Sequence, residues 1–245
     1  MPEVADNRTA YAEHGAGTAT LEVLEGAGAY NRWIVELIAP RLGELNIELG
    51  AGQGTLTEIV GETHRVFPFE LSEHNQRVLT QRFDGHPRVA PCRADLLEYR
   101  EWGSVDAVYS ANVLEHIEDD LGVIRHCARL LRPGGWFVAF VPAGPWLYSA
   151  FDRALGHCRR YGRADKARFE QITNAEARLE LREFRYVNTI GALGWFVKMR
   201  LFGQVSVKAG DAAWAERLLP INKMVDALNP PFGQSVLFAL QRTQD

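Results

Sequence analysis

Apolar and polar positions along the chain follow two alternating patterns, one typical of helices and one typical of strands. Residues 29–43 place four large apolar side chains on one helical face, and Pro40 and Gly43 end that pattern. Short apolar runs separated by helical stretches follow at 46–49, 65–71, 87–92, 104–114, 136–142, 179–187 and 235–242. This alternation predicts an α/β fold with a doubly wound, mostly parallel seven-stranded sheet. The last two runs could finish the sheet as an antiparallel pair.

A single domain accounts for the whole chain of 245 residues. Residues 1–28 show little periodicity and are interpreted as an N-terminal extension. Residues 191–230 form an insert rich in Trp, Phe and Leu before the last strand. Such residues at helical spacing predict a helical lid or a dimer face. Lys198 and Arg200 beside apolar residues also leave open a helix on a membrane surface.

Composition limits the classes of function. Lys and Arg number 27 against 31 Asp and Glu, and this net charge of −4 argues against a protein that coats nucleic acid. Cys92, Cys127 and Cys158 stand far apart, which favours reduced thiols over a disulfide framework or a zinc site. The sequence shows neither an apolar signal segment nor a run of about 18 apolar residues. We therefore expect a cytoplasmic protein without stable membrane insertion.

Three glycines at alternate positions follow the first predicted strand. Gly50, Gly52 and Gly54 also open the next helix, so the backbone can approach a ligand closely and offer it free N–H groups. A dinucleotide loop needs Gly or Ala where Thr55 stands. That residue, and the lack of a Tyr-x-x-x-Lys pair, disfavour an NAD-dependent oxidoreductase.

Acidic residues at the strand ends narrow the ligand further. Glu70 ends the second strand 22 residues after Glu48 (70 − 48), about where an acid accepts hydrogen bonds from ribose hydroxyls. Asp95 follows the third strand and could face an adenine amino group. A carboxylate at Glu48 suits a ligand with an ammonium and a sulfonium better than a pyrophosphate. The pattern favours a cationic amino-acid nucleoside.

The chain contains four motifs: ELGAGQGT with Glu70, RADL at 93–96, NVLEHI at 112–117 and LRPGG at 131–135. Together, over residues 29–142, these motifs resemble those of class I S-adenosylmethionine-dependent methyltransferases. The resemblance implies S-adenosyl-L-methionine as cofactor and residues 29–142 as the cofactor-binding core. It also implies that the cofactor is lined by Glu48, Gly50, Gly52, Glu70, Leu71, Asp95, Leu96 and Asn112. Tyr30 and Arg32 are further candidates; Arg32 could pair with the methionine carboxylate or be an ordinary surface residue.

Residues 143–163, beyond the fifth strand, are expected to border the methyl acceptor and are called the acceptor-side segment below. The candidate substrate-binding residues are Tyr148, Asp152, Arg159, Arg160 and, from the insert, Trp195. The candidate catalytic residues are His157, His116 and Tyr161, because a histidine titrates near physiological pH and can act as a base.

Two of these assignments have a structural alternative. Arg159 and Arg160 could hold a phosphate or carboxylate of the acceptor, or they could pair with Asp152 and Glu170 to anchor the segment. His116 could be a base, or it could cap the following helix.

The motifs YNRW, GHxRRY and PPFGQS resemble a branch of bacterial small-molecule methyltransferases met in glycolipid and natural-product pathways. That resemblance implies a small or lipid-like acceptor and a role in secondary metabolism. Residues 229–232, NPPF, are also similar to the N-P-P-[YF] motif of amino-methyltransferases. Only 13 residues follow Phe232 (245 − 232), too few for the rest of a sheet, so NPPF predicts a rigid turn into the last strand.

The sequence predicts no metal site. Some quinone-pathway O-methyltransferases of this fold carry E-x-x-E-H at the position of NVLEH and bind a divalent ion there. Here Asn112 replaces the first acid, and sites for hard cations depend on carboxylates.

The sequence therefore predicts a methyltransferase that acts on oxygen or carbon of a small, partly apolar metabolite, which could be anionic or lipid-like. We expect its partner to be a small-molecule substrate and not nucleic acid. The insert could also form the interface of a homodimer. The alternatives are a non-catalytic S-adenosylmethionine-binding subunit and, less favoured, the oxidoreductase. The complete acceptor-side segment argues against the non-catalytic alternative.

Overall fold

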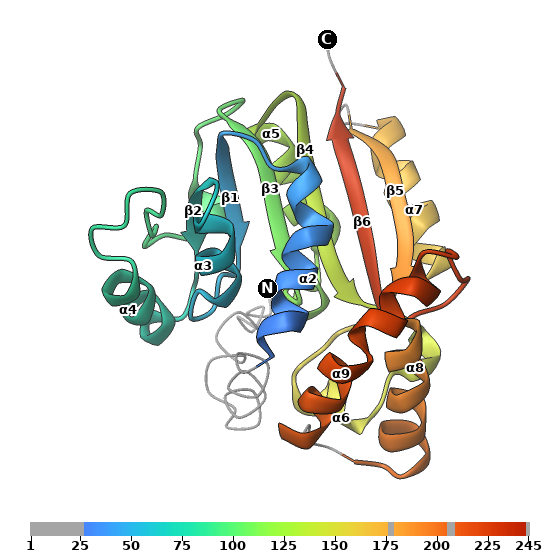
Figure 1. Cartoon of the computed structure of the whole chain (residues 1–245). Helices are drawn as coiled ribbons and strands as arrows, with labels where there is room; N and C mark the ends of the chain where they lie inside the picture. The colour runs from blue at the N-terminus through green and yellow to red at the C-terminus, as the bar shows by residue number, and fades with distance from the viewer. Residues whose placement is uncertain (1–26, 176–178, 205–208, 244–245) are drawn as a thin grey trace, which may run out of the picture.

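The computed structural model describes residues 27–175, 179–204 and 209–243. Six strands form one sheet in the order β2-β1-β3-β4-β6-β5 (Figure 1). Their bounds are β1 Leu45–Leu49, β2 Arg65–Phe69, β3 Val105–Ala111, β4 Leu131–Pro142, β5 Leu179–Val187 and β6 Ser235–Arg242. β6 runs antiparallel to both of its neighbours, and the other pairs are parallel. The predicted α/β class and the antiparallel pair at the end of the chain are confirmed.

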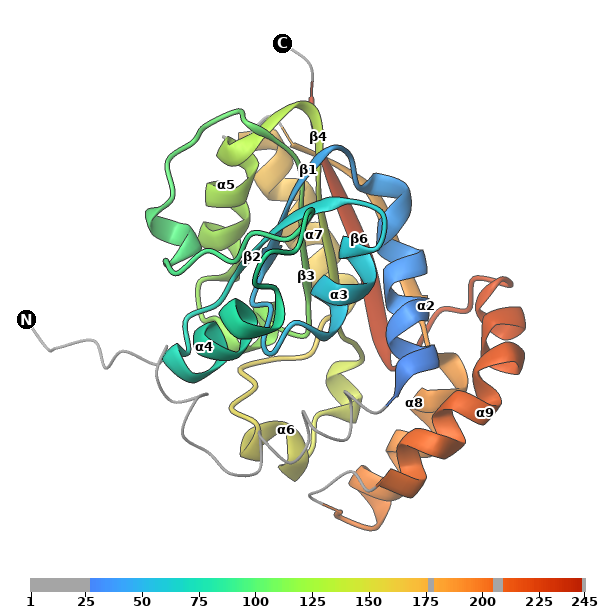
Figure 2. The same cartoon turned by 60° about the vertical axis from the view of Figure 1, so that its left-hand side comes forward.

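Helices cover both faces of this sheet (Figures 1 and 2). Their bounds are α2 Gly28–Ile38, α3 Thr55–Gly61, α4 Glu73–Arg82, α5 Asp120–Leu130, α6 Ala150–Ala154, α7 Arg163–Ala175, α8 Thr189–Trp195 and α9 Ala209–Asp226. Side chains of α2 and α3 pack in one apolar cluster with one face of the sheet. Side chains of α5 and α7 pack in a second cluster with the other face. Each helix buries one side against the sheet, and this explains why apolar residues lie on one face of its sequence pattern and polar residues on the other.

The predicted seventh strand, residues 87–92, does not form a continuous strand. It meets β2 at two isolated bridges, Val66 with Val89 and Phe69 with Cys92. Val66 N donates to Arg88 O, Ala90 N to Val66 O and Cys92 N to Pro68 O. The rung that would join these bonds needs an N–H at Pro68, and proline has none. Pro68 therefore accounts for the six-stranded sheet.

A second boundary also differs from the expectation. The sequence predicts a strand over 136–142, but α5 ends at Leu130 and that strand, β4, already begins at Leu131. Leu131 pairs with Val105 of β3, and the Leu131 side chain is fully buried in the core. Sheet pairing has overridden the local helical pattern.

The insert, residues 191–230, is helical where it is described. It contains most of α8, a π-helical turn at Phe196–Leu201, and α9, with residues 205–208 lying outside the described part. Asp226 near the end of α9 is buried and accepts hydrogen bonds from the backbone N–H groups of Asn188 and Thr189 at the start of α8. These bonds hold the two helices together beyond the carboxyl edge of the sheet (Figure 1). The role of a lid stays a prediction.

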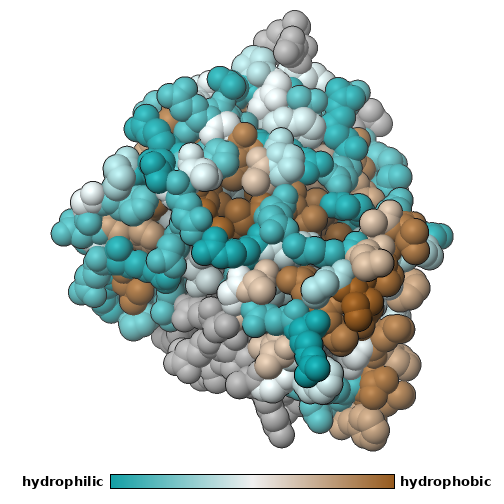
Figure 3. Space-filling view, viewed as in Figure 1, coloured by the Kyte–Doolittle hydropathy of each residue, from teal (hydrophilic) through white to brown (hydrophobic). Residues whose placement is uncertain are grey.

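The insert exposes an apolar surface. Figure 3 shows brown side chains gathered over the region of α8 and α9. The large exposed apolar residues of the insert are Leu193, Phe196, Val197, Leu201, Phe202, Trp214, Ile221, Met224 and Leu228. None of the described helices is both long enough and apolar enough to cross a membrane. The homodimer stays a prediction. Residues 1–26 of the predicted N-terminal extension lie outside the described residues.

Candidate active site

Strand order reverses between β1 and β3, because the chain passes from β1 outward to β2 and then returns to the other side of β1. In open α/β sheets, ligands bind beyond the carboxyl ends of the strands at such a point. The glycine loop, residues 50–54, leaves β1 there, and Asn112 follows β3 there. The predicted ligand site therefore coincides with the topological position that the fold favours.

The three glycines of the loop have different roles. All have a positive φ, +72° at Gly50, +56° at Gly52 and +91° at Gly54, a region that side chains with a Cβ rarely adopt. A Cβ on Gly50 would lie 2.5 Å from Val113, and one on Gly54 would lie 2.6 Å from Phe83. A Cβ on Gly52 would meet no atom of the described residues within 4 Å. Gly50 and Gly54 thus allow close packing, while Gly52 presents bare backbone to open space.

Glu70 ties the glycine loop to the end of β2. Its Oε2 accepts a hydrogen bond from the backbone N of Gly52 (2.8 Å), and its Oε1 accepts one from the backbone N of Ser72 (2.8 Å). Burial raises the pKa of Glu70, and these backbone hydrogen bonds oppose that rise. The carboxylate shapes the loop, and each oxygen keeps a second lone pair for a ligand hydroxyl.

Glu48 lies deeper than the sequence suggests. Its side chain is buried between β1 and α3, where Oε2 accepts hydrogen bonds from Thr57 Oγ1 (2.5 Å) and Tyr109 Oη (3.0 Å). Burial raises the pKa of Glu48 to about 7, despite the hydrogen bonds from Thr57 and Tyr109 that lower it. The structure gives Glu48 a supporting position behind the loop, and its contact with an ammonium group stays a prediction.

The other candidates for cofactor binding fall into two groups. Asn112 (φ +54°) directly follows β3, and Asp95 follows the apolar run 87–92, as expected. The Oδ1 atom of Asp95 accepts a hydrogen bond from the backbone N of Leu97 (2.8 Å). Leu71 is 49% exposed at the same edge, whereas Leu96 is only 1% exposed and packs in the core. Leu96 can therefore offer a ligand only its backbone.

The polar residues of the YNRW motif make contacts outside the glycine loop. Tyr30 Oη accepts a hydrogen bond from Asn188 Nδ2 (3.1 Å) and so links α2 to α8. Arg32 forms an ion pair with Glu62 (3.1 Å), and both side chains are more than half exposed. This arrangement matches the surface alternative for Arg32.

Asp152 is the centre of the acceptor-side segment. Its carboxylate is fully buried and accepts hydrogen bonds from Arg160 Nε (2.7 Å), His157 Nδ1 (3.0 Å) and both the backbone N and Oγ of Ser149. Burial raises its pKa, but the bond from His157 and the charge of Arg160 outweigh that effect and lower the pKa to about 2. The carboxylate is therefore ionised and fixes the ring of His157.

The two arginines are used as anchors. Arg160 is 4% exposed, donates from Nη1 to the Ala143 carbonyl (3.1 Å) and lies over the Trp195 ring at 4.6 Å. Arg159 pairs with Asp120 (2.9 Å) and donates to the Glu118 carbonyl. The anchoring alternative is confirmed for Asp152 and Arg160, but Glu170 pairs with Lys166 instead.

Three further candidates also hold the segment in place. Tyr148 Oη donates to the His157 carbonyl (2.7 Å), and Trp195 Nε1 donates to the Leu147 carbonyl (3.3 Å), which joins the insert to the segment. Tyr161 is fully buried, and its hydroxyl donates to Asp120 Oδ2 (3.0 Å). The geometry gives Tyr161 a structural position in the core rather than a place in an open cavity.

His116, His157 and Glu115 come together although 42 positions separate the two ends of the group in sequence (157 − 115). The two imidazole rings meet edge to face with centroids 4.6 Å apart. One ligand-type atom from each of the three residues lies within 4.8 Å of the others. His116 does not cap the next helix, because the N-cap of α5 is Asp119, whose side chain accepts from Gly122 N. The capping alternative is wrong.

Glu115 was not a candidate in the sequence. Its side chain is fully buried, and among the described residues neither carboxylate oxygen has a hydrogen-bond partner. Burial raises its pKa to about 7, although the charge of His157 lowers it. Burial, together with the charge of His157, lowers the pKa of His116 to about 3. In the sequence, the only sign of a role for Glu115 was its place before His116 in NVLEHI. The fold shows that Glu115 lies beside His157.

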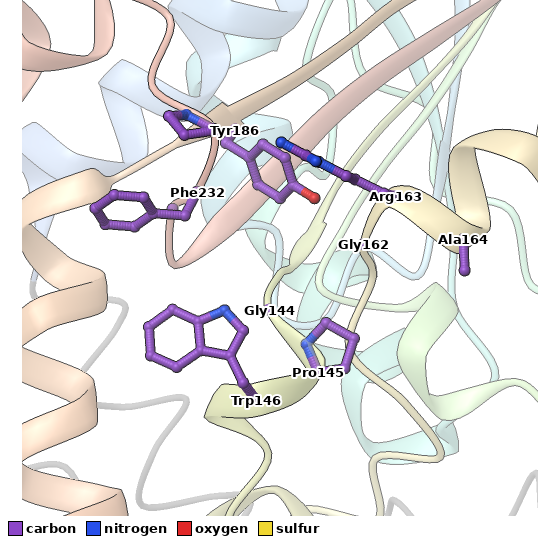
Figure 4. Close-up of a pocket in the computed structure, with 10 residues that line it drawn as sticks. Gly144, Pro145, Trp146, Gly162, Arg163, Ala164, Tyr186 and Phe232 are labelled. Carbon is purple, nitrogen blue, oxygen red and sulfur yellow. The ribbon is translucent and has the colours of Figure 1, made fainter.

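A hollow of about 220 Å³ lies beside the two ends of the acceptor-side segment. Trp146, Tyr186 and Phe232 place aromatic rings around it, and Arg163 lies at its edge (Figure 4). NPPF lies in the connection from α9 to β6, at the place where the sequence predicts a turn, and its Pro231 and Phe232 line this hollow. Periodicity could not reveal these residues, because they come from separate places in the sequence: the turn after β4, the start of α7, the end of β5 and the connection before β6.

Segment 112–116 joins the two halves of the site. Val113 packs on Gly50 of the glycine loop so closely that a Cβ there would lie 2.5 Å away. Two and three residues further on, Glu115 and His116 face His157. Segment 112–116 therefore contacts both the glycine loop and His157.

Comparisons with known proteins agree with this geometry. Residues 47–139 match the family described as "Methyltransferase domain". The ubiquinone biosynthesis O-methyltransferase of Bordetella avium is 30% identical over 110 residues, which are 42% of this chain and 45% of that protein. A probable S-adenosylmethionine-dependent methyltransferase of Mycolicibacterium smegmatis is 26% identical over 177 residues, 71% of this chain and 68% of that protein. The chain spans about half the length of the ubiquinone-pathway relatives it matches.

Solved structures share the fold. The geranyl diphosphate C-methyltransferase of Streptomyces coelicolor A3(2), in complex with Mg²⁺, geranyl diphosphate and S-adenosyl-L-homocysteine, superposes with a TM-score of 0.60 at 18% identity. The superposition covers 86% of this chain and 79% of that one. Residues 47–139 are therefore similar to a methyltransferase domain, and the described part of the chain shares the fold of this solved structure.

Proposed function

We propose that this chain transfers a methyl group from S-adenosyl-L-methionine to an oxygen or carbon atom of a small, partly apolar metabolite. The observation that carries the proposal is the junction at 112–116. It packs on the glycine loop at Val113 and faces His157 with Glu115 and His116. Donor and acceptor groups would be held on either side of it, and holding two reactants in line is the main requirement of a methyl transfer.

The residues around the glycine loop fit the cofactor. Gly52 offers open space above its backbone, Glu70 offers carboxylate oxygens, and the exposed Leu71 offers an apolar cover at the same edge. When bound, the cofactor supplies a methyl group on a positively charged sulfur. The carboxylate of Glu70 would favour that positive charge, whereas it would repel the pyrophosphate of a dinucleotide.

His157 is the proposed base for an acceptor that must lose a proton. Its Nδ1 is fixed by Asp152, which leaves Nε2 as the nitrogen that can take a proton. His116 lies beside it and, with a pKa lowered to about 3, is neutral at physiological pH. We assign Tyr161, Tyr148, Asp152, Arg159 and Arg160 positioning roles, in place of direct contact with the acceptor.

The hollow beside the segment supports a partly apolar acceptor. Three aromatic rings would contact an apolar body, and Arg163 would favour an anionic group at its edge. Trp195 of the insert contacts Leu147 and Arg160 of the acceptor-side segment. The insert is therefore the proposed lid over the acceptor.

The test is an incubation of the full chain with methyl-labelled S-adenosylmethionine and a metabolite extract of its host. Label in one extractable, partly apolar compound is the expected result. A chain that binds the cofactor but moves no label in extracts from several growth conditions would instead be a binding subunit without activity.

A further inference from the structure

The junction contains a buried acid without a partner in an otherwise well-paired region. Asp152, Arg160 and His157 satisfy one another, yet both oxygens of Glu115 lack a hydrogen-bond partner among the described residues and the side chain is fully buried. A buried ionised carboxylate is costly unless it is paired or binds a cation. Protonation would remove the charge but would still leave the new hydroxyl without an acceptor.

We propose that Glu115, His116 and His157 form a binding site for a divalent transition-metal ion of the zinc type. One oxygen of Glu115 and one nitrogen of each histidine already lie within 4.8 Å of one another. Small rotations of these side chains would bring all three atoms to about 2.1 Å from a shared ion. The carboxylate, which has the charges of His157 and Arg160 near it but no hydrogen-bond partner among the described residues, would then bind a cation directly.

The surroundings of His157 match those of a metal ligand. Histidines that bind metals usually donate their other ring N–H to a carboxylate, which fixes the ring. His157 does this through Nδ1 to Asp152 (3.0 Å), and Arg160 holds Asp152 in turn (2.7 Å). Nε2 is thereby left for the ion.

The ligand set selects the kind of ion. Two imidazoles and one carboxylate are typical of zinc and of other borderline transition metals, with a position left open for water or substrate. Mg²⁺ prefers oxygen ligands only. The sequence predicts no metal site because Asn112 stands where an acidic ligand is expected. In the fold, His157 from a distant segment brings a nitrogen ligand to Glu115 and His116.

An ion here would have a chemical use, and this part rests on the proposed function. A hydroxyl of the acceptor that binds the ion would have a lowered pKa and would lose its proton to water. The resulting oxygen anion would then take the methyl group while the carbon–sulfur bond of the donor breaks, leaving a neutral thioether. His157 would in that case hold the ion and not act as the base.

The test is a titration of the metal-stripped full chain with Co²⁺, which reports low-coordinate nitrogen and oxygen ligation by its visible absorption, followed by competition with Zn²⁺. We expect one ion per chain, displaced by Zn²⁺ and not by Mg²⁺. Glu115→Gln and His157→Ala should each remove the absorption, and His74→Ala, at an exposed position of α4, should leave it unchanged.

Cofactor binding by calorimetry checks that each variant is folded. If one of the two site variants fails to fold, the other still decides. Lack of Co²⁺ binding by the wild-type chain would overturn the site, as would binding that survives both substitutions. Because the titration uses no acceptor, a chain that binds the ion but transfers no methyl group would contradict the proposed function and leave the site standing.

Discussion

The glycine loop after β1 and the acceptor-side segment after β4 both lie at the carboxyl edge of the sheet, but different contacts hold them. The loop is shaped mainly by left-handed backbone conformations and by the hydrogen bond from Gly52 to Glu70, 18 residues further on, and Val113 packs on it from a distant segment. The acceptor-side segment is held by buried charges and by contacts with the insert, such as Trp195. The comparison teaches that one half of the site is built locally and the other by the tertiary fold.

The largest effect should come from breaking the buried network of the acceptor-side segment. Asp152→Ala leaves Arg160 buried and unpaired, so we expect about 3–5 kcal/mol of lost stability in urea unfolding. Glu170→Ala, at a half-exposed pair with Lys166, should cost about 0.5 kcal/mol or less. Equal losses in the two variants would mean that the network does not hold the segment.

The same carboxylate predicts acid sensitivity. Folding lowers the pKa of Asp152 to about 2 from its usual value of 3.8. Its contribution to stability is therefore present above pH 3.8 and lost as the pH falls through about 2. Unfolding measured from pH 5 to pH 2 should show a steeper loss for the wild type than for Asp152→Ala. Parallel curves would contradict the assignment.

On the loop side, Gly52→Val should remove cofactor binding while sparing the fold. Gly85 is a matched control, because it also has a positive φ (+69°) and no atom within 4 Å of an added Cβ. Both valines carry the same backbone strain, so only Gly52→Val should lose roughly 100-fold or more in affinity, about 2.8 kcal/mol. Calorimetry with S-adenosylmethionine decides; similar losses in both variants would show that strain alone is responsible.

A smaller effect is expected at Glu48, behind the loop. Its pKa is raised to about 7 from 4.5, so the stability it gives in the protonated form is lost as pH rises from about 4.5 through 7. Glu48→Gln keeps the shape without the charge and should stabilise the cofactor-free chain by about 1–3 kcal/mol at pH 8. The two proteins should be nearly equal at pH 4.5. A gain that did not depend on pH would rule out titration as the cause.

The smallest effect is expected at Arg32. Its pair with Glu62 is exposed, and such pairs contribute about 0–1 kcal/mol. We expect Arg32→Ala to change cofactor affinity less than about threefold, since less than 0.7 kcal/mol is involved. A tenfold or larger loss would restore the predicted contact with the methionine carboxylate.

These differences also explain how far the sequence could be interpreted. The glycine loop, Glu70 and Asn112 were found because their roles depend on neighbours in sequence and on strand ends. Glu115 and the aromatic hollow were missed because their partners come from segments 30 or more residues away, such as His157. The prediction of a seventh strand at 87–92 was wrong because Pro68 of β2 has no N–H for the hydrogen bond that would join the two bridges.

The most direct test of the account compares His157→Ala with the wild type in two assays on the same preparations, cofactor binding by calorimetry and transfer of labelled methyl. We predict unchanged affinity for S-adenosylmethionine and transfer lower by roughly 10²–10⁴-fold, since base or metal-ion assistance would be lost while the loop is untouched. His74→Ala should match the wild type in both. Transfer that persists unchanged in His157→Ala, with the cofactor bound normally, would contradict the division of the site into a cofactor side and an acceptor side.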